Sequence, residues 1–172
     1  TCLGGGTGSG AAPVICALAR EEGALTLCAA TTPLRMEGSR RMRNARSAIR
    51  ELDEATDGLI LIPNQALLTE AISAREAFAR SSEILRTLAR DISELILVHG
   101  LITIDLADLH VLFRDGPIGR VGTASSSTGD AAAAARAALT SPTMTDVSVS
   151  EASGVLVIIS GGPEMALFSV AE

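Results

Sequence analysis

Residues 4–15 read GGGTGSGAAPVI, and the interpretation of the whole chain begins from this stretch. Five of its first seven residues are glycines, so the backbone can form a tight loop and approach a ligand closely. The helix predicted to follow, residues 11–22, adds backbone amides with partial positive charge at its N-terminus. A loop of this kind that leads into a helix favours phosphate binding. The candidate phosphate-binding residues are Gly4, Gly5, Gly6, Thr7, Gly8, Ser9 and Gly10.

The glycine loop differs from two common nucleotide-binding motifs. No lysine follows its last glycine, as in a P-loop, and no acidic residue ends a following strand near Ala30, as in a dinucleotide-binding fold. The structural alternative is a glycine-rich turn that only lets a helix pack closely. A phosphate loop of this type should follow a strand, and we expect none before Gly4. The chain is therefore interpreted as a fragment that lacks its N-terminal part and its C-terminal end.

The composition and the net charge of the chain limit which partners it is expected to bind. The chain has 172 residues, a net charge of −6, and 47% hydrophobic but only 2% aromatic residues. We therefore expect an aliphatic core, and the negative charge disfavours nucleic acid and anionic membrane surfaces. Cys2, Cys16 and Cys28 have no metal-binding spacing, so we expect no metal ligands, and their odd number without a signal sequence indicates reduced thiols. No apolar run reaches the roughly 18 residues that span a bilayer.

Hydrophobic periodicity predicts alternating strands and helices. Continuous apolar runs at 24–31 and 57–63 indicate buried parallel strands, with a crossover helix over 39–55 between them. The longest periodic segment, 75–98, predicts a helix of roughly 35 Å. The other expected elements are a short helix or loop at 64–74, helices at 107–114 and 130–139, strands at 117–127, 147–149 and 155–160, a turn at 161–163 and the start of a helix at 165–171. A change in composition near Gly100 predicts two domains, 1–99 and 100–172.

Several segments, taken in order, resemble one family. The string GGGTGSGAAPV resembles the signature loop of the tubulin/FtsZ family, and its AAPV continuation is similar to FtsZ rather than to eukaryotic tubulin. Residues 101–109 (LITIDLADL) resemble the acidic loop of FtsZ, and residues 32–42 (TPLRMEGSRRM) resemble a second family loop. Shorter similarities are IPNQ at 62–65, AF at 77–78, TSP at 140–142, and GVL and SGGP within 154–163.

This resemblance implies a guanine-nucleotide site assembled from distant parts of the chain. By their positions in the family motifs, Glu37 and Arg41 fall on residues that contact the ribose and the phosphates. Asn64 is expected near the sugar, and Phe78 is expected to stack on guanine. The local alternatives are a solvated helix arginine for Arg41, a helix N-cap for Asn64 and core packing for Phe78.

The resemblance also implies that hydrolysis is shared between subunits. Asp105 and Asp108 match the acidic loop that, in the family, inserts into the nucleotide site of the next subunit. Their carboxylates would orient the attacking water without a covalent step. The local alternative is an ordinary helix start, with Asp105 as N-cap and Asp108 three residues later.

The chain departs from the family pattern at four positions: Gln65, Ser82, Thr103 and Ile158. Ser82 stands where the family usually has Asp or Asn, which reads the guanine edge. One hydroxyl cannot accept from two guanine N–H groups as a carboxylate can, and Glu83 is a second candidate for this role. His99 and His110 show no partner pattern, and we expect His110 to be exposed and non-catalytic.

The expected fold is α/β: the C-terminal part of a Rossmann-like GTPase domain that ends in a long central helix, then the start of an α+β activation domain. The resemblance implies GTP or GDP as ligand, with Mg²⁺ alongside, in a GTPase of the bacterial division ring that polymerises head to tail. We expect a cytoplasmic protein at the division site, with membrane-tethering partners but no insertion of its own. The fragment alone should be inactive. The alternatives are a catalytically weakened filament or scaffold paralogue and an unrelated dinucleotide-binding enzyme.

Overall fold

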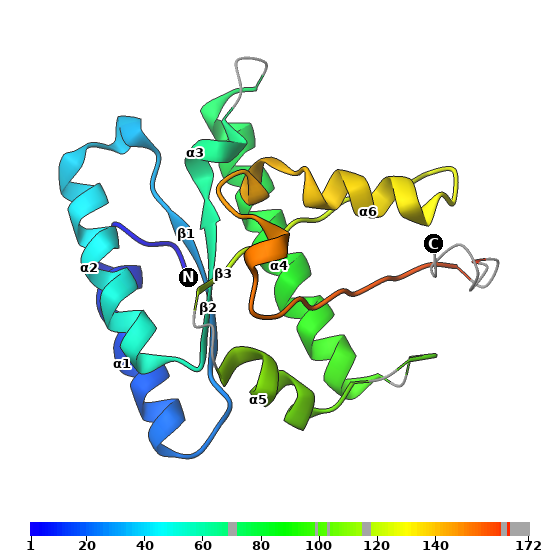
Figure 1. The fold of residues 1–172 in the computed structure, drawn as a ribbon. Coiled ribbons are helices and arrows are strands. Elements are labelled where there is room, and N and C mark those ends of the chain that lie inside the picture. Colours follow the sequence, from blue (N-terminus) through cyan, green and yellow to red (C-terminus); the bar gives the residue numbers. More distant parts are fainter. Residues whose placement is uncertain (69–71, 99, 103, 115–117, 163–164, 166–172) are drawn as a thin grey trace.

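The fold is described from a computed structural model, which describes residues 1–68, 72–98, 100–102, 104–114, 118–162 and 165. Helices and short strands alternate along the chain (Figure 1). The helices are α1 (Gly6–Glu21), α2 (Ser39–Ala55), α3 (Asn64–Leu67), α4 (Ala74–Leu97), α5 (Leu106–Arg114) and α6 (Ala131–Leu139), and the strands are β1 (Leu27–Thr32), β2 (Gly58–Pro63) and β3 (Ile118–Gly119). Short 3₁₀ turns lie at Arg35–Glu37, Pro142–Met144 and Val149–Glu151.

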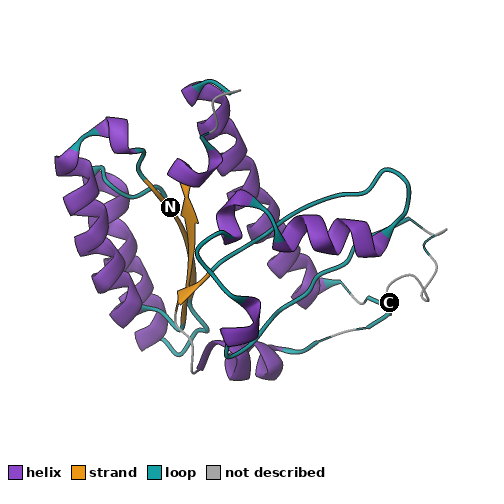
Figure 2. Ribbon diagram, turned by 45° about the horizontal axis from the view of Figure 1, so that its top comes forward, coloured by secondary structure: helices purple, strands orange, loops and turns teal. Residues whose placement is uncertain are grey.

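The strands form a parallel sheet in the order β1-β2-β3, with Leu27 opposite Gly58 and Leu59 opposite Ile118. Helices α1 and α2 lie on one side of the sheet and α4 lies on the other, which gives three layers (Figures 1 and 2). The β1–α2–β2 crossover agrees with the expected βαβ unit. The predicted α/β class is therefore confirmed. Strand β3 lies beyond the domain boundary predicted near residue 100 and nevertheless pairs with β2.

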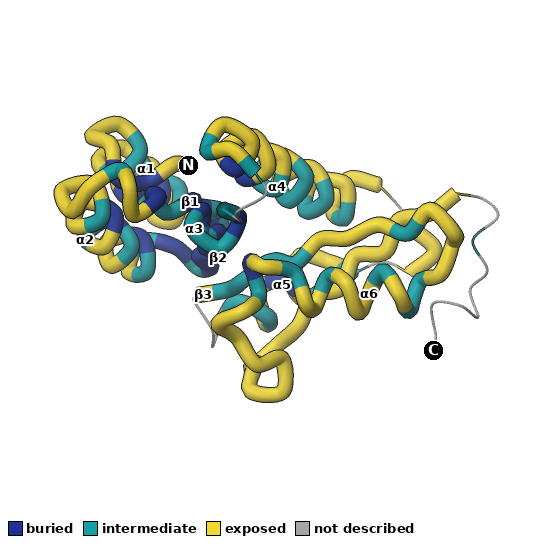
Figure 3. Tube along the Cα trace, turned by 90° about the horizontal axis from the view of Figure 1, so that it is seen from above, coloured by how far each residue is buried: buried dark blue, intermediate teal, exposed yellow. Residues whose placement is uncertain are grey.

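The core is aliphatic, as the composition predicted. Ala30, Leu52 and Leu59 belong to a buried cluster between the sheet and the helices α1 and α2. All residues of β2 except Pro63 are buried, as in a strand covered on both faces. Figure 3 shows buried residues gathered in this half of the molecule, whereas α6 and the segment after it are mostly exposed.

No strand precedes the glycine loop among the described elements, as predicted, but a short extended segment there bridges to the edge of the sheet. Cys2 forms a parallel bridge with Thr31, and the Leu3 amide donates to the Thr31 carbonyl at 2.9 Å. The Thr31 amide in turn donates to the carbonyl of Thr1 at 3.0 Å. The glycine loop therefore leaves the edge of the sheet, as a phosphate loop should.

The first helix also begins earlier than predicted, at Gly6 rather than Ala11. Gly4, with φ of +106°, redirects the chain, and its amide donates to the Ser9 hydroxyl at 2.8 Å. The Ser9 amide donates to the Gly5 carbonyl, which closes the first helical turn. Glycine composition favoured a loop here, but these contacts outweigh the low helix propensity of glycine, about 1 kcal/mol per residue.

Predictions for the remaining elements differ in quality. Helix α2 has the predicted bounds, α4 and α5 start one residue early, and Asp130 caps α6 through the Ala133 amide at 2.8 Å. The strand predictions for the last third are wrong: only Ile118–Gly119 of 117–127 pairs, and 147–149 and 155–160 form no strand. The residues of these segments favour strands, but they pair with no other strand within the described residues. Apolar side chains such as Val157 are therefore exposed there. The helix predicted at 165–171, apart from Met165, and the positions His99, Thr103 and Pro163 lie outside the described residues.

None of the described helices is both long enough and apolar enough to cross a bilayer. The three thiols are free, and Cys16 and Cys28 are buried, whereas Cys2 is exposed.

Thiol labelling should separate these cysteines. Burial, and secondarily the neighbouring Cys16, raises the pKa of the Cys28 thiol to about 11. Since the thiolate is the reactive form, we expect iodoacetamide at pH 8 to label Cys2 long before Cys28. Mass spectrometry of peptides after timed alkylation, in native buffer and in urea, measures this difference. Labelling of Cys28 at the rate of Cys2 in native buffer would contradict the packing of α1 on β1.

Candidate functional site

A pocket of about 490 Å³ opens where the glycine loop enters α1, between the ends of β1 and β2 and the first turns of α4. The residues that line this pocket come from six parts of the chain. Nine of the twelve nucleotide-binding residues predicted from the sequence line it: Gly5, Gly6, Thr7, Gly8, Glu37, Arg41, Asn64, Phe78 and Ser82. The remaining lining residues are Cys2, Leu3, Thr31 and Ser81.

The N-terminus of α1 forms one wall of this pocket. No side chain caps the helix at Gly5, so its first amides are available to a ligand. A Cβ atom at Gly5 or Gly6 would meet no other atom within 4 Å, so this wall is open to the pocket. Gly8 is different, because its Cβ would collide with the Cys2 carbonyl. The wall has the chemistry of an anion site: exposed backbone donors at the positive end of a helix dipole.

Three predicted residues lie outside the pocket lining: Gly4, Ser9 and Gly10. Gly4 packs against Arg41 and Pro33, and a Cβ there would lie 3.3 Å from the Arg41 Cβ. The Ser9 hydroxyl is used inside the loop, since it accepts from the Gly4 amide. These residues shape the loop, and their predicted direct contact with phosphate stays a prediction.

Glu37 and Arg41 form the second wall. Arg41 Nη1 lies 2.7 Å from Glu37 Oε2, while Glu37 Oε1 accepts from the Leu34 amide at 2.7 Å. Glu37 is thus held on both carboxylate oxygens, and Arg41 remains more than half exposed. A pair this exposed contributes little to stability, about 0–1 kcal/mol, and Arg41 is free to turn toward an anion.

Asn64 lies at the bottom of the pocket and has an unsatisfied atom. The residue is 4% exposed, and its Oδ1 has no hydrogen-bond partner within the described part of the chain. Leaving a buried acceptor unpaired costs about 1–3 kcal/mol, which indicates a missing donor. The alternative of a helix N-cap is wrong, because Pro63 occupies the cap of α3 and no side chain caps it. The neighbouring Gln65 accepts from the Arg35 amide at 3.0 Å and ties α3 to the second wall.

Helix α4 supplies the third wall through Phe78, Ser81 and Ser82. Phe78 is 40% exposed, so the alternative of simple core packing is wrong and a ring face is available for stacking. Ser82 donates its hydroxyl proton to the Phe78 carbonyl at 2.9 Å. Ser81 is buried at 3% exposure.

The sequence did not predict Cys2, Leu3, Thr31 or Ser81 as lining residues. Thr31 lies at the C-terminal end of β1, where ligands of parallel sheets bind, so the strand prediction could have found it. Cys2 and Leu3 reach the pocket only through their bridge to β1, which no local pattern reveals.

Asp105 and Asp108 do not belong to this pocket. They form a reciprocal capping box at the start of α5, in which the Asp108 amide donates to Asp105 at 2.9 Å and the Asp105 amide donates to Asp108 at 3.0 Å. Both side chains are exposed. The pocket lies near the start of α4, whereas α5 follows its far end (Figure 1). A helix of 24 residues extends about 36 Å, so one molecule cannot bring the two groups together.

A second pocket of about 440 Å³ lies near α5. It is lined by Arg20, Asp53, Thr56, Asp57, His110, Val111 and Phe113. Arg20 is paired there with Asp57 at 3.1 Å, and His110 is exposed, as expected. Among the described residues no group of three acidic, histidine or cysteine side chains could hold a metal ion.

Comparisons with known proteins indicate the family and the fold of this chain. A family model described as the tubulin/FtsZ GTPase domain matches residues 1–71, and one described as the FtsZ C-terminal domain matches residues 118–172. The chain is 41% identical to the cell division protein FtsZ of Bartonella bacilliformis, over 99% of this chain and 29% of the relative. The chain thus spans less than half of the curated relatives that it matches.

Two solved structures show the same fold. An empty FtsZ dimer from M. jannaschii superposes with a TM-score of 0.77 at 37% identity, over 83% of this chain and 43% of that one. A GTPγS-bound protofilament of CetZ2 from Haloferax volcanii gives a TM-score of 0.58 at 28% identity, over 77% of this chain and 39% of that one.

Fold and sequence together identify an α/β protein of the tubulin-like class, with a parallel sheet and a glycine loop at the start of a helix. Within that class, the chain belongs to the tubulin/FtsZ family.

Proposed function

We propose that the full-length protein binds GTP in the pocket at the start of α1, hydrolyses it, and polymerises head to tail in cell division. The observation that carries the binding step is the convergence of the α1 amides, Arg41 and Asn64 on one cavity. The amides and Arg41 suit phosphates, and the amide side chain of Asn64 is proposed to lie near the sugar. Phe78 offers a stacking face for the base, which is worth about 1–3 kcal/mol.

The distance between the pocket and the acidic pair supports a site shared by two molecules. Asp105 and Asp108 are exposed carboxylates at the start of α5, which follows the far end of α4, and there they could enter the pocket of a second copy. Each carboxylate would accept a hydrogen bond from the attacking water and orient it in line with the terminal phosphate. The similar CetZ2 chain was solved as a protofilament and the similar FtsZ chain as a dimer, which supports assembly of this chain with copies of itself.

Mg²⁺ fits this site only as a companion of the nucleotide. It usually keeps several waters and binds one or two carboxylates together with substrate phosphates. Glu37 is the one carboxylate among the lining residues, and it is held by Arg41 and the Leu34 amide. When bound, Mg²⁺ would neutralise phosphate charge.

The proposed setting is the division site in the cytoplasm. It is supported by the relative named as a cell division protein and by the proposed substrate, a nucleotide of the cytosol. Partners that tether such a filament to the membrane are part of this proposal.

The proposal is tested by GTP turnover per molecule, measured against the concentration of the full-length protein. If two molecules complete one site, turnover should rise steeply at the concentration where light scattering reports polymers. Turnover per molecule that is constant across this range would contradict the shared site. Failure to bind any guanine nucleotide would contradict the proposal as a whole.

A catalytically weakened filament or scaffold protein is the second candidate. It is favoured by the capping box, because both aspartates are already used at the start of α5. This candidate predicts nucleotide binding and polymers, with turnover that stays low at every protein concentration.

A further inference from the structure

Gly58, the first residue of β2, faces the side of the sheet on which α5 lies. Leu59 and Leu61, further along the same strand, belong to the core cluster with α1 and α2. Because successive residues of a strand point to opposite faces, Gly58 and Ile60 point to the other face. Figure 1 shows α4 and α5 on that side of the sheet. A side chain at position 58 would therefore point toward these helices.

The ring of Phe113, near the C-terminal end of α5, rests directly on Gly58. A Cβ atom at residue 58 would collide with this ring and would lie 2.9 Å from its Cγ atom. The Cγ atom can retreat only if the Phe113 χ1 angle changes or the helix moves, and χ1 in a helix is restricted to two common values. This contact between β2 and α5 therefore requires glycine at position 58.

A second buried side chain holds the middle of α5. Leu109 is 1% exposed and lies four residues before Phe113, so the two side chains point from the same face of the helix. Asp105 lies four residues before Leu109 and accepts from the Asp108 amide at the start of the helix. At 1.5 Å per residue, Leu109 is about 6 Å along the helix axis from both Asp105 and Phe113. A tilt of α5 about Leu109 therefore moves Asp105 about as far as it moves Phe113.

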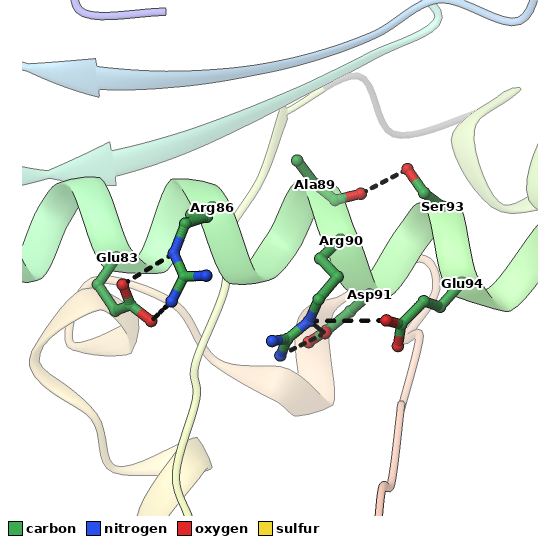
Figure 4. Close-up of polar contacts among 7 residues, drawn as sticks. All are labelled: Glu83, Arg86, Ala89, Arg90, Asp91, Ser93 and Glu94. Atoms are coloured by element: carbon green, nitrogen blue, oxygen red, sulfur yellow. Dashed lines mark hydrogen bonds and ion pairs between the residues drawn. The ribbon is translucent and has the colours of Figure 1, made fainter.

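The polar side chains of α4 do not hold the acidic pair. The connection from α4 to α5 is open to solvent, with Leu101 85% and Ile102 82% exposed. The ion pairs drawn in Figure 4 join residues of α4 to one another: Glu83 with Arg86, and Arg90 with Asp91 and Glu94. The position of α5 thus depends on its packing against the sheet.

From these contacts we propose that Gly58 is a positioning residue for Asp105 and Asp108. The inference rests on the proposed function, in which these carboxylates enter the pocket of a neighbouring molecule. Gly58 acts through Phe113, whose contact with β2 sets the angle of α5 against the sheet. Neither residue lines the nucleotide pocket, and Phe113 lines the second pocket instead.

Gly58→Ala in the full-length protein should lower GTP turnover per polymerised molecule by about ten- to a hundredfold. Carbon atoms in contact lie about 3.5–4 Å apart, so the ring must retreat by roughly 1 Å. A misplacement of this size costs up to about 10²-fold in rate. Affinity of the unassembled protein for labelled GDP should not change. The measurements are phosphate release from sedimented polymer and displacement of labelled GDP below the assembly concentration.

Gly119→Ala is the matched control. Gly119 pairs with Ile60 in the same sheet, and a Cβ atom there would lie 3.7 Å from the Ile60 Cγ1 atom, an ordinary contact. We expect wild-type turnover and affinity from it. Phe113→Ala is a second test variant, which removes the ring and leaves β2 unchanged. It should also lower turnover, because α5 loses its contact with Gly58, and it provides the test if Gly58→Ala does not fold.

Copolymers distinguish positioning from general destabilisation. A Gly58→Ala molecule keeps an intact pocket but has displaced aspartates. It should therefore recover turnover when mixed with Arg41→Ala, which has a damaged pocket and intact aspartates. It should not recover with the double variant Asp105→Asn and Asp108→Asn, which lacks the same catalytic part. A molecule that is only destabilised would behave alike with both partners.

The outcomes separate this inference from the proposed function. Unaltered turnover in folded Gly58→Ala, or in Phe113→Ala where Gly58→Ala does not fold, would overturn the inference and leave the shared site standing. Equal behaviour with the two mixing partners would also overturn it. A wild-type, full-length polymer that does not cleave GTP would overturn the proposed function and this inference together.

Discussion

Replacing Asp105 and Asp108 together by alanine should lower GTP turnover of the full-length polymer by about 10²–10⁴-fold, the usual contribution of a positioned acid or base. Nucleotide affinity of the unassembled protein should not change, because neither residue lines the pocket. The measurements are phosphate release at a concentration well above assembly and displacement of labelled GDP below it. Loss of affinity without assembly would contradict the separation of the two groups.

Alanine also removes the capping box, so a second variant must separate the two roles. Each aspartate accepts from the backbone amide of the other, and removal of such a cap costs about 0.5–2 kcal/mol. Asparagine is an equally good cap but carries no charge. The pair Asp105→Asn and Asp108→Asn should therefore keep α5 and still lose turnover. Unaltered turnover in this variant would leave the aspartates with a structural role only.

Mixing two variants of the protein provides an independent test of whether neighbouring molecules share one active site. A molecule with a damaged pocket can still lend its aspartates, and one without aspartates can still bind nucleotide. A mixed polymer of the two should recover part of the turnover that each lacks alone. No recovery in polymers shown to contain both would contradict a site formed between neighbours.

Local patterns predicted the helices well, because the information that specifies them is local. The bounds of α2 were correct, and α4 was wrong by one residue at each end, since their apolar faces repeat within each turn. The start of α1 was wrong because it depends on the Ser9 side chain and on the bend at Gly4. No periodicity reports such contacts.

Strands were predicted less well, because a strand depends on a partner. The predicted runs 24–31 and 57–63 contain most of β1 and all of β2, which pair with each other, whereas 155–160 has similar apolar character and no partner among the described residues. The same reason explains why Cys2 and Leu3 were missed. Their place in the pocket depends on the bridge to Thr31, a residue 29 positions away from Cys2 in the chain.

The sequence predicted which residues form the candidate site, but not how their side chains are arranged. Glycine-loop chemistry and the family resemblance named nine residues that the fold brings together, although they span 78 positions from Gly5 to Ser82. Neither could show that Glu37 is paired with Arg41 or that Glu83 is paired with Arg86. Those pairings decide which charges a ligand meets, and they depend on rotamers rather than on sequence spacing.

Gly8→Ala should weaken nucleotide binding more than any other single methyl group added to the loop. Helix propensity alone predicts the opposite, since alanine in a helix is favoured over glycine by about 0.5–1 kcal/mol. However, a Cβ at Gly8 would collide with the Cys2 carbonyl, which is backbone and is held in place by the bridge to Thr31. Either the extended segment or α1 must move, at a cost of about 1–3 kcal/mol, and both line the pocket.

Gly10→Ala is the matched control for this prediction, because it lies in the same helix and its Cβ would meet nothing within 4 Å. It should stabilise the full-length protein by about 0.5–1 kcal/mol and leave nucleotide affinity unchanged. Gly8→Ala should lower both the urea midpoint and the affinity for labelled GDP. If the two variants behave alike, the close approach of α1 to Cys2 does not exist in solution. If Gly10→Ala alone loses affinity, Gly10 contacts the phosphates directly, as the sequence suggested, and the first wall of the pocket extends further along α1 than its present lining.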